Sequence, residues 1–283
     1  MLLQLQNVSV SHPASAAGHE AALSDLTLSV HAGEQIALIG PSGAGKTTLL
    51  HMLACAYKPS QGSYRLFDQQ PWSLSEHARH ALRRRLFLAP QTPPLPPRQR
   101  VVTTVLAGRL PSWSLWHALR NLIKPMEPEI AFDALARFHL QHKLYERVDR
   151  LSGGERQRCG LARLLLSDAN LLLVDEPLSA LDPTLAIHTL HTLQQEARER
   201  NAALICSLHQ VDLARKHFKR IIGLRDGKIV FDSEHVTDDM IAALYANIRS
   251  DTHTDTVASS FSTDAFIANA AAVADIIHDP RCI

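Results

Sequence analysis

The sequence predicts an α/β protein with a mainly parallel sheet, an antiparallel β-subdomain and a helical subdomain. Short apolar strands alternate with helical segments of ten or more residues, which requires crossover connections between parallel strands. Two strands with alternating apolar residues, near residues 3–10 and 26–30, come before the first fully apolar strand and predict the antiparallel part. Residues from about 101 to 150 have a mostly helical pattern and predict a helical subdomain over about 92–160.

A glycine-rich loop lies between the apolar strand Ile36–Ile39 and an apolar helix. Its residues are Gly40, Pro41, Ser42, Gly43, Ala44, Gly45, Lys46, Thr47 and Thr48. They match the P-loop, in which glycines let backbone N–H groups surround a phosphate chain. Lys46 is expected to reach the β- and γ-phosphates, and the Thr47 hydroxyl to bind Mg²⁺. Glycines before a helix can also serve only a tight turn, but the full pattern favours a P-loop NTPase core that binds a nucleoside triphosphate.

Composition limits the expected partners. Lys and Arg number 29 against 28 Asp and Glu, so the near-zero net charge gives no electrostatic case for a nucleic-acid partner. The four cysteines include no Cys-x-x-Cys pair, so neither a disulfide framework nor a zinc site is expected. No signal-peptide pattern begins the chain, and no apolar run reaches the roughly 18–20 residues of a membrane span. Membrane association is therefore expected to occur through partners.

The segment after the P-loop helix predicts a further strand of the β-subdomain near residues 64–67 and a basic helix over residues 73–85. The basic residues of this helix are Arg79, Arg83, Arg84 and Arg85. We interpret them as a solvated face, with a phosphate or partner site as the alternative. Residues 86–88 then predict a short buried strand.

Prolines are dense after Gln91. Residues 92–97 cannot form a helix or an inner strand, because most of them lack an N–H group or precede a proline. We expect a stiff surface loop, with a polyproline ligand for another protein as the alternative. Trp113 and Trp116, three residues apart in the helical segment, are expected to pack in a core or an interface.

Two carboxylates follow a buried strand in the second half of the chain. The strand Leu171–Val174 delivers Asp175 and Glu176 at its C-terminal end, which in a doubly wound sheet lies beside the P-loop. Phosphoryl transfer to water needs a metal ligand and a group that orients or deprotonates the attacking water. The sequence therefore predicts Asp175 as the metal ligand and Glu176 as the residue that acts on the water.

A second glycine-containing helix start lies about twenty residues before Asp175. Its residues are Ser152, Gly153, Gly154 and Glu155. A hydroxyl and unpaired N–H groups at a helix start can hold an anion. The plain alternative is that Ser152 only caps the helix. The position of this segment ahead of Asp175 favours the anion site.

The C-terminal part carries fewer chemical signals. Residues 204–206 predict another parallel strand, and residues 221–231 predict a hairpin that turns at Asp226 and Gly227. Residues 246–283 are expected to be an extension of unknown role, loosely ordered apart from an Ala-rich helix near residues 266–277.

These segments together resemble the nucleotide-binding domain of ABC ATPases over residues 1–245. The matching motifs, in the family's order, are Gly40–Thr48, Gln91, Leu151–Glu155, Asp175 with Glu176, Ser179–Asp182 and His209. The resemblance implies ATP and Mg²⁺ as cofactors, with Gln91 reaching the metal and His209 contacting the γ-phosphate. It also implies that Asp182 meets the opposite subunit. In this family an aromatic residue usually stacks on adenine, and His12, with its smaller ring, is the candidate here.

The resemblance further implies a head-to-tail dimer, in which the Ser152 segment of one copy closes over the P-loop of the other and two ATP molecules are buried. ATP binding then favours the closed dimer and hydrolysis reopens it. The expected partners are integral membrane permease subunits and, indirectly, an extracytoplasmic solute-binding protein. The expected location is the cytoplasmic face of the inner membrane.

More specific strings resemble the ATPase subunit of phosphonate importers. They are Val105–Leu110, Trp113–Leu119, Asp149–Gly154, Ser207–Leu213 and Arg220–Gly227. This resemblance implies ATP hydrolysis coupled to uptake of a phosphonate or a related phosphorus oxyanion, with the cargo chosen by other subunits. The alternatives are the ATPase of another transporter, a soluble ABC ATPase of DNA repair or translation, and a noncatalytic subunit. The two carboxylates and His209 argue against the last of these.

Overall fold

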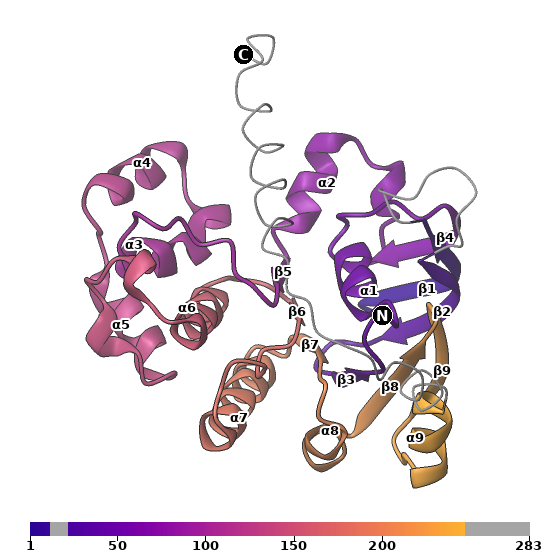
Figure 1. Ribbon diagram of the computed structural model, residues 1–283. Coiled ribbons are helices and arrows are strands. Elements are labelled where there is room, and N and C mark those ends of the chain that lie inside the picture. Colours follow the sequence, from indigo (N-terminus) through magenta and orange to yellow (C-terminus); the bar gives the residue numbers. More distant parts are fainter. Residues whose placement is uncertain (12–21, 247–283) are drawn as a thin grey trace, which may run out of the picture. The chain divides into compact units, whose positions relative to one another are not determined.

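A six-stranded sheet forms the centre of the protein. The computed structural model describes residues 1–11 and 22–246, of which Met1–Tyr245 form one compact unit (Figure 1). The strand order is β5-β6-β7-β3-β8-β9, and only β9 runs antiparallel to its neighbour. These strands are β3 (Gln35–Ile39), β5 (Leu86–Ala89), β6 (Leu171–Val174), β7 (Ala203–Ser207), β8 (Arg220–Arg225) and β9 (Lys228–Ser233). The predicted mainly parallel sheet is confirmed.

A three-stranded antiparallel sheet of order β2-β1-β4 lies beside it. Its strands are β1 (Leu3–Val10), β2 (Leu23–Val30) and β4 (Gln61–Leu66). The predicted β-subdomain is therefore confirmed as well. The predicted hairpin is β8 and β9, and its turn residues Asp226 and Gly227 both have positive φ angles, of 47° and 71°.

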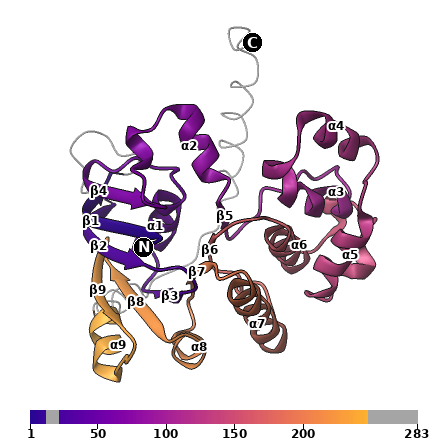
Figure 2. The ribbon, with the colours of Figure 1, turned by 180° about the vertical axis from the view of Figure 1, so that it is seen from behind.

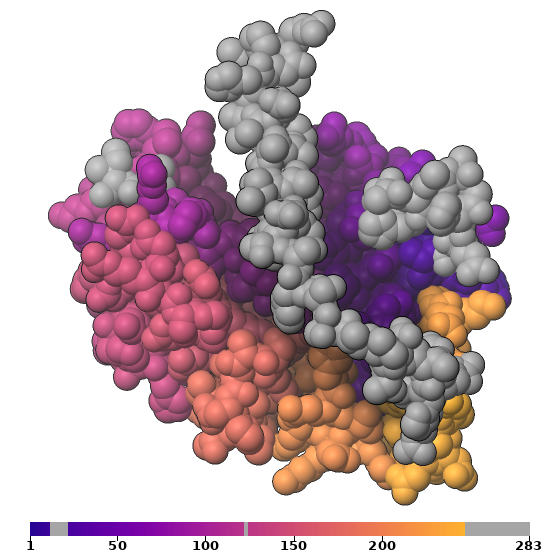
Figure 3. Space-filling model, in the orientation of Figure 1, coloured from indigo at the N-terminus to yellow at the C-terminus, as the bar shows by residue number. Residues whose placement is uncertain are grey.

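Helices connect the parallel strands and also build a separate helical segment between β5 and β6. The helices are α1 (Lys46–Leu53), α2 (Glu76–Arg83), α3 (Val101–Leu106), α4 (Leu115–Ile123), α5 (Pro128–Ala136), α6 (Gly153–Leu165), α7 (Pro183–Glu199), α8 (Val211–His217) and α9 (Asp238–Tyr245). In views from opposite sides, α3, α4 and α5 gather away from the β8–β9 hairpin (Figures 1 and 2). In the space-filling view their magenta and pink atoms are likewise separate from the orange hairpin (Figure 3). None of the helices in the described ranges is long and apolar enough to span a bilayer.

The two faces of the parallel sheet contribute to two different apolar cores. Because side chains alternate along a strand, Leu172 and Val174 of β6 join the core formed with the helical segment and α7. Leu171 and Leu173 join the core formed with α1 and the antiparallel sheet. A strand that is apolar on both faces is thereby fixed firmly, and the residues that follow β6 are held at one place.

One expectation needs correction, and two others gain detail. Residues 86–88 are only partly buried, because β5 is the edge strand and pairs only with β6. Trp113 packs against the helical core, as expected, whereas Trp116 is 79% exposed, so for Trp116 only the interface alternative stays a prediction. The basic face is largely solvated, as expected, since Arg83, Arg84 and Arg85 are exposed. In addition, Arg79 lies over the Trp72 ring, and Arg83 donates a hydrogen bond to the Cys55 carbonyl.

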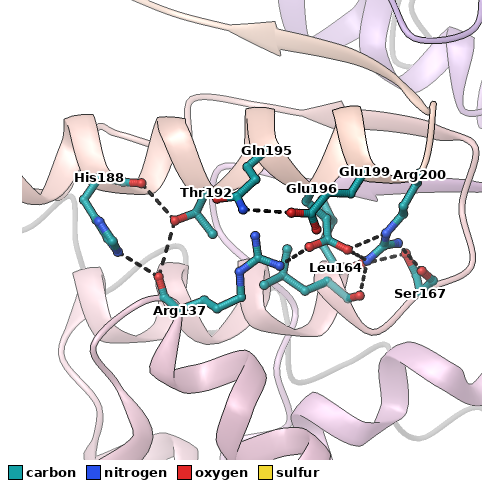
Figure 4. Close-up of polar contacts among 10 residues, drawn as sticks. Arg137, Leu164, Ser167, His188, Thr192, Gln195, Glu196, Glu199 and Arg200 are labelled. Carbon is teal, nitrogen blue, oxygen red and sulfur yellow. Dashed lines mark hydrogen bonds and ion pairs between the residues drawn. The ribbon is translucent and has the colours of Figure 1, made fainter.

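A network of charged side chains joins α7 to the helical segment (Figure 4). Glu196 of α7 is buried and pairs with both Arg137, at the end of α5, and Arg200, at the end of α7. The Arg200 guanidinium also donates hydrogen bonds to the carbonyls of Leu165 and Ser167, where α6 ends. The cation thus occupies the carbonyl-rich end of α6, where positive charge is favourable. The C-terminal ends of α6 and α7 are therefore fixed to one another.

Candidate active site

The glycine-rich loop connects β3 to the first turn of α1. Gly40 has a φ angle of 154°, and a Cβ atom there would lie 2.0 Å from the Leu224 carbonyl oxygen, so no other residue fits. Gly45, with a φ angle of 100°, turns the chain into the helix. Ser42 and Gly43 lie at the exposed tip of the loop and Ala44 is buried below it. The backbone thus has the conformation in which successive N–H groups can surround a phosphate.

Lys46 begins α1 and is only 5% exposed. Its Nζ atom donates hydrogen bonds to the carbonyls of Gly40 and Pro41, at 2.8 and 3.0 Å. Burial lowers the pKa of Lys46, and the nearby carboxylates of Glu176 and Asp175 oppose that shift. A buried ammonium group supported by two carboxylates is a suitable partner for the negative charge of a triphosphate.

Asp175 follows β6 and is 3% exposed. Its Oδ2 atom accepts a hydrogen bond of 2.8 Å from the Thr47 hydroxyl, and its Oδ1 atom accepts one of 2.6 Å from the Ser207 hydroxyl. The predicted proximity of the P-loop and the end of β6 therefore exists in the structure. A carboxylate and a hydroxyl side by side are the oxygen donors that Mg²⁺ prefers, since this ion takes one or two protein ligands together with water and phosphate oxygens.

Glu176 is fixed through its backbone. Its φ angle of 47° is unusual for a residue other than glycine. Its N–H group donates to the Ser207 hydroxyl at 2.8 Å, and its carbonyl accepts from Gln157 Nε2 at 2.7 Å. These bonds hold the residue in a backbone conformation that directs its side chain away from the path of a continued strand.

The Glu176 carboxylate meets the two remaining predicted residues. Gln91 Nε2 donates a hydrogen bond to Oε2 at 2.7 Å, and His209 Nε2 lies 2.5 Å from Oε1. Both contacts involve residues that follow strands of the central sheet, Gln91 after β5 and His209 after β7. Glu176 is nearly buried while the His209 side chain is 51% exposed, so the group faces solvent on the histidine side. Gln91, Glu176 and His209 thus form one cluster next to Asp175 and Thr47.

The second glycine-containing helix start is a capping box. The Ser152 hydroxyl accepts from the Glu155 N–H group at 3.2 Å, and the Glu155 carboxylate accepts from the Ser152 N–H group at 2.7 Å. The bond to Ser152 also lowers the pKa of Glu155. The Ser152 hydroxyl proton stays available to an anion, and both Ser152 and Gly153 are exposed. The plain capping interpretation is therefore correct, and it is compatible with anion binding.

The loop Ser179–Asp182 lies against this helix start. A Cβ atom at Gly154 would lie 2.7 Å from the Ala180 carbonyl oxygen, so the close approach requires glycine. Asp182 is the N-cap of α7 and accepts a hydrogen bond from the Leu185 N–H group at 3.0 Å. Among the contacts of the described residues, none links Ser152 or Asp182 to the P-loop of the same chain. The two segments expected to face another subunit are thus neighbours, and Ser179 joins them to the Glu176 backbone through a hydrogen bond of 3.2 Å to its carbonyl.

Two site residues were not singled out from sequence. Ser207 bridges Asp175 and Glu176, and Gln157 of α6 holds the Glu176 carbonyl. A hydroxyl at the C-terminal end of an apolar strand, two residues before His209, was the available signal for Ser207. Gln157 had none, because its contact depends on how α6 packs. His12 lies outside the described residues.

The nucleotide-binding geometry agrees with comparisons to known proteins. The model of the ABC transporter family matches residues 23–179, more than half of the chain. The chain belongs to the ABC transporter family. The chain is 59% identical to the phosphonates import ATP-binding protein PhnC 2 of Albidiferax ferrireducens. That comparison covers 87% of this chain and 90% of that protein. It is 48% identical to phosphonates import ATP-binding protein PhnC 2 of Pseudomonas aeruginosa over the full length of both.

A solved structure shares the fold of this ABC protein. It is a dimeric ATP-binding cassette in a post-hydrolysis state, bound to ADP and Pi. The TM-score is 0.69 at 24% identity, with 83% of this chain and 100% of that chain covered. The predicted fold class is therefore confirmed. The family match and the curated relatives confirm the predicted family, and the chain is a nucleotide-binding ATPase subunit.

Proposed function

We propose that this chain is the ATP-hydrolysing subunit of a phosphonate importer. The observation that carries this proposal is the Glu176 carboxylate held between Gln91 and His209 beside the Asp175–Thr47 pair. The relatives of nearly full length that are named phosphonate import ATP-binding proteins support the cargo. The cargo itself is a phosphonate or a related phosphorus oxyanion, selected by other subunits.

Each site residue has a distinct role in the proposed reaction. The backbone of Gly40–Thr48 holds the phosphate chain, and Lys46 neutralises the β- and γ-phosphates. Glu176 orients the attacking water and accepts its proton, and its hydrogen bonds keep the carboxylate at one position for that step. His209 contacts the γ-phosphate from the exposed side of Glu176.

Mg²⁺ fits the residues that are present. Thr47 and Asp175 would hold it, with Gln91 nearby, and the ion would neutralise charge on the β- and γ-phosphates. The described residues contain no group of three or more His, Cys, Asp or Glu that could hold a metal ion by themselves. This suits an ion that binds together with ATP and takes most of its ligands from phosphate and water.

The working unit is a dimer of this chain on a permease. Ser152, Gly153, Gly154 and Glu155 of one copy face the ATP on the P-loop of the other, together with the loop that ends at Asp182. The exposure of Ser152 and its free hydroxyl proton support this arrangement. The dimer binds integral membrane subunits at the cytoplasmic face of the inner membrane, and an extracytoplasmic solute-binding protein delivers the cargo.

The decisive experiment replaces Glu176 by Gln. We expect ATP turnover to fall about 10²- to 10⁴-fold, because an amide cannot accept the proton of water. ATP binding should persist, since the P-loop is unchanged, and the ATP-bound dimer should accumulate in size-exclusion chromatography. Glu129→Gln, the same change at an exposed position of α5, should hydrolyse ATP normally. Hydrolysis by Glu176→Gln at the unaltered rate would refute the role of Glu176.

The cargo is tested in cells that lack this chain. Growth with an alkylphosphonate as the only phosphorus source should be restored by the unaltered chain together with its permease and binding protein. The Glu176→Gln variant should not restore it. If growth on phosphonate does not depend on the chain while ATP hydrolysis does depend on Glu176, the ATPase assignment holds and the cargo assignment is wrong.

A further inference from the structure

Helix α4 presents an apolar face that nothing in the described part of the chain covers. Leu115, Trp116 and Leu119 are 78%, 79% and 48% exposed. At 100° per residue they lie on one side of the helix, within about 100° of one another. Large apolar side chains that are exposed singly need no explanation, but three on one short helix form a patch.

The helix is held firmly enough to present this face. The Ser114 hydroxyl accepts from the His117 N–H group and caps the helix, and the Trp113 ring lies 4.8 Å from the His117 ring. At the other end the buried Asn121 side chain accepts from the Met126 N–H group at 2.9 Å. The exposed residues are therefore carried by a fixed helix.

The exposed face is distinct from the cavity behind the helix. A cavity of about 300 Å³ is lined by Trp113, Ala118 and Asn121 together with residues of the proline-rich loop and α3. At 100° per residue Asn121 lies about 120° or more around α4 from Leu115, Trp116 and Leu119, and Ala118 lies between Asn121 and Leu115. A segment bound in that cavity would leave the face formed by Leu115, Trp116 and Leu119 uncovered.

The charges next to this face are basic. Between Trp113 and Met126 the sequence contains Arg120 and Lys124 but no Asp or Glu. Both cations are exposed, and no contact with another side chain occupies either of them in the described residues. The first acid beyond, Glu127, is already paired with Arg109 at 2.6 Å. Leucine and tryptophan flanked by Arg and Lys form the pattern of helices that lie in a membrane interface, where cations meet anionic headgroups.

We propose that α4 contacts the anionic lipid surface beside the permease through Leu115, Trp116 and Leu119. This inference rests on the proposed function, which brings the chain to the membrane. The helix has nine residues, so by itself it binds lipid weakly, and the binding is measurable only at high concentration. Once a permease holds the chain at the bilayer, the lipid contact becomes intramolecular and a weak interaction suffices. In both ribbon views α4 lies at the same end of the molecule as α2 (Figures 1 and 2).

The test uses the full chain with vesicles in the absence of ATP. Vesicles of phosphatidylcholine containing phosphatidylglycerol should sediment the chain and shift its tryptophan emission to shorter wavelength. The double variant Trp116→Ser/Leu119→Ser should bind at least fivefold less, and Arg120→Glu/Lys124→Glu should lose the preference for anionic vesicles. Val230→Ser, which removes an exposed apolar residue from β9, should bind like the unaltered chain. ATP hydrolysis by the dissolved Trp116→Ser/Leu119→Ser chain should remain unchanged, because α4 contributes no site residue.

Four results would overturn the proposal. The first is that the unaltered chain fails to bind anionic vesicles even at high concentration, and the second is that the Trp116→Ser/Leu119→Ser variant binds them as well as the unaltered chain does. Alternatively, the α4 variant no longer co-purifies with the permease in detergent while its vesicle binding persists, which would make the face a protein contact. A changed oligomeric state of the variant in light scattering, with unchanged vesicle binding, would assign the face to a second copy. None of these depends on Glu176, so failure here is distinguishable from failure of the proposed ATPase.

Discussion

Ser207 contacts both acidic residues of the site with one hydroxyl group, the carboxylate of Asp175 and the backbone of Glu176. It donates a hydrogen bond to Asp175 and accepts one from the Glu176 N–H group, and it is fully buried. The proposed metal ligand and the residue proposed to act on water are therefore placed by the same atom. Any displacement of that hydroxyl changes the distance between the two functions.

We expect Ser207→Ala to lower the rate of ATP hydrolysis about tenfold. The substitution leaves the Glu176 N–H group and one Asp175 oxygen without a partner, a loss of about 1–3 kcal/mol. Steady-state hydrolysis at saturating Mg²⁺ and ATP measures the effect. Ser179→Ala is the matched control, because that hydroxyl donates only to the Glu176 carbonyl and touches neither carboxylate. Equal rates for Ser207→Ala and the control would contradict the positioning role.

The ends of α6 and α7 are joined by one buried acid. Glu196 lies between the guanidinium groups of Arg137 and Arg200, and Arg200 in turn occupies the end of α6. Removing the acid leaves two partly buried cations close together. Loss of one partner from such a group is more damaging than loss of an exposed pair.

Glu196→Gln should destabilise the protein by about 2 kcal/mol, between the values for exposed and fully buried pairs. Urea denaturation followed by circular dichroism gives the difference in the free energy of unfolding. Glu199→Gln makes the same change one turn further along α7, where the carboxylate only accepts from Gln195. The urea concentration at the unfolding midpoint of Glu199→Gln should equal that of the unaltered chain within experimental error. A shift as large as that of Glu196→Gln would show that the buried network is not the cause of the destabilisation.

A pair of histidines links α7 to α8. His191 Nε2 lies 3.2 Å from His217 Nδ1, and Gln194 donates to the His217 carbonyl at 2.8 Å. Burial lowers the pKa of His217, and the neighbouring His191 and Lys216 lower it further. The folded protein thus keeps this imidazole neutral at a pH where the unfolded chain binds a proton.

Stability should therefore fall as the pH drops below about 6.5, the ordinary value for histidine, and should be unaffected by His217 above it. We expect His217→Gln to reduce the decrease in melting temperature between pH 7.5 and pH 5.5. Differential scanning calorimetry at several pH values measures it. His77→Gln on the exposed face of α2 is the control. If the melting temperature of His217→Gln decreases with falling pH as steeply as that of the unaltered chain, His217 is not the group responsible.

For the whole molecule, the sequence was most informative where function depends on local pattern. The strand, loop and helix around Lys46 and the two acids after β6 are local, and they were predicted with their roles. The exposure of Trp116 and the network around Glu196 could not be predicted, since they depend on how segments far apart in the chain pack. Glu196 meets Arg137 across 59 positions, and no periodicity in the sequence marks that pair.

The composite site makes a prediction about the assembled dimer. Ser152→Asp keeps an N-cap but places a negative charge where the γ-phosphate of the opposite copy would lie. Heterodimers with two affinity tags can carry Ser152→Asp and Lys46→Met on the same copy or on different copies. With the two changes on different copies, one complete site remains and about half of the activity should persist. With both on one copy, no complete site remains.

Higher activity from the heterodimer that carries both changes on one copy would mean that Ser152 acts on its own P-loop. Fluorescence-monitored unfolding of Ser152→Asp is the control, because an intact cap should leave stability unchanged. If the helix start unfolds, Ser152→Asn serves as a neutral capping substitute.

The Arg200 guanidinium fixes the C-terminal end of α6, so the helix can pivot about that end. The helix has 13 residues, so its N-terminal end at Ser152 lies about 20 Å from the C-terminal end, where Arg200 binds the carbonyl of Leu165. If the helix tilts as a rigid rod by about 5° about its C-terminal end, its N-terminal end moves by about 1.7 Å. That displacement separates a formed hydrogen bond from a broken one. A small rotation of the helical segment would thus make or break the proposed contact between Ser152 and the phosphate bound by the other copy.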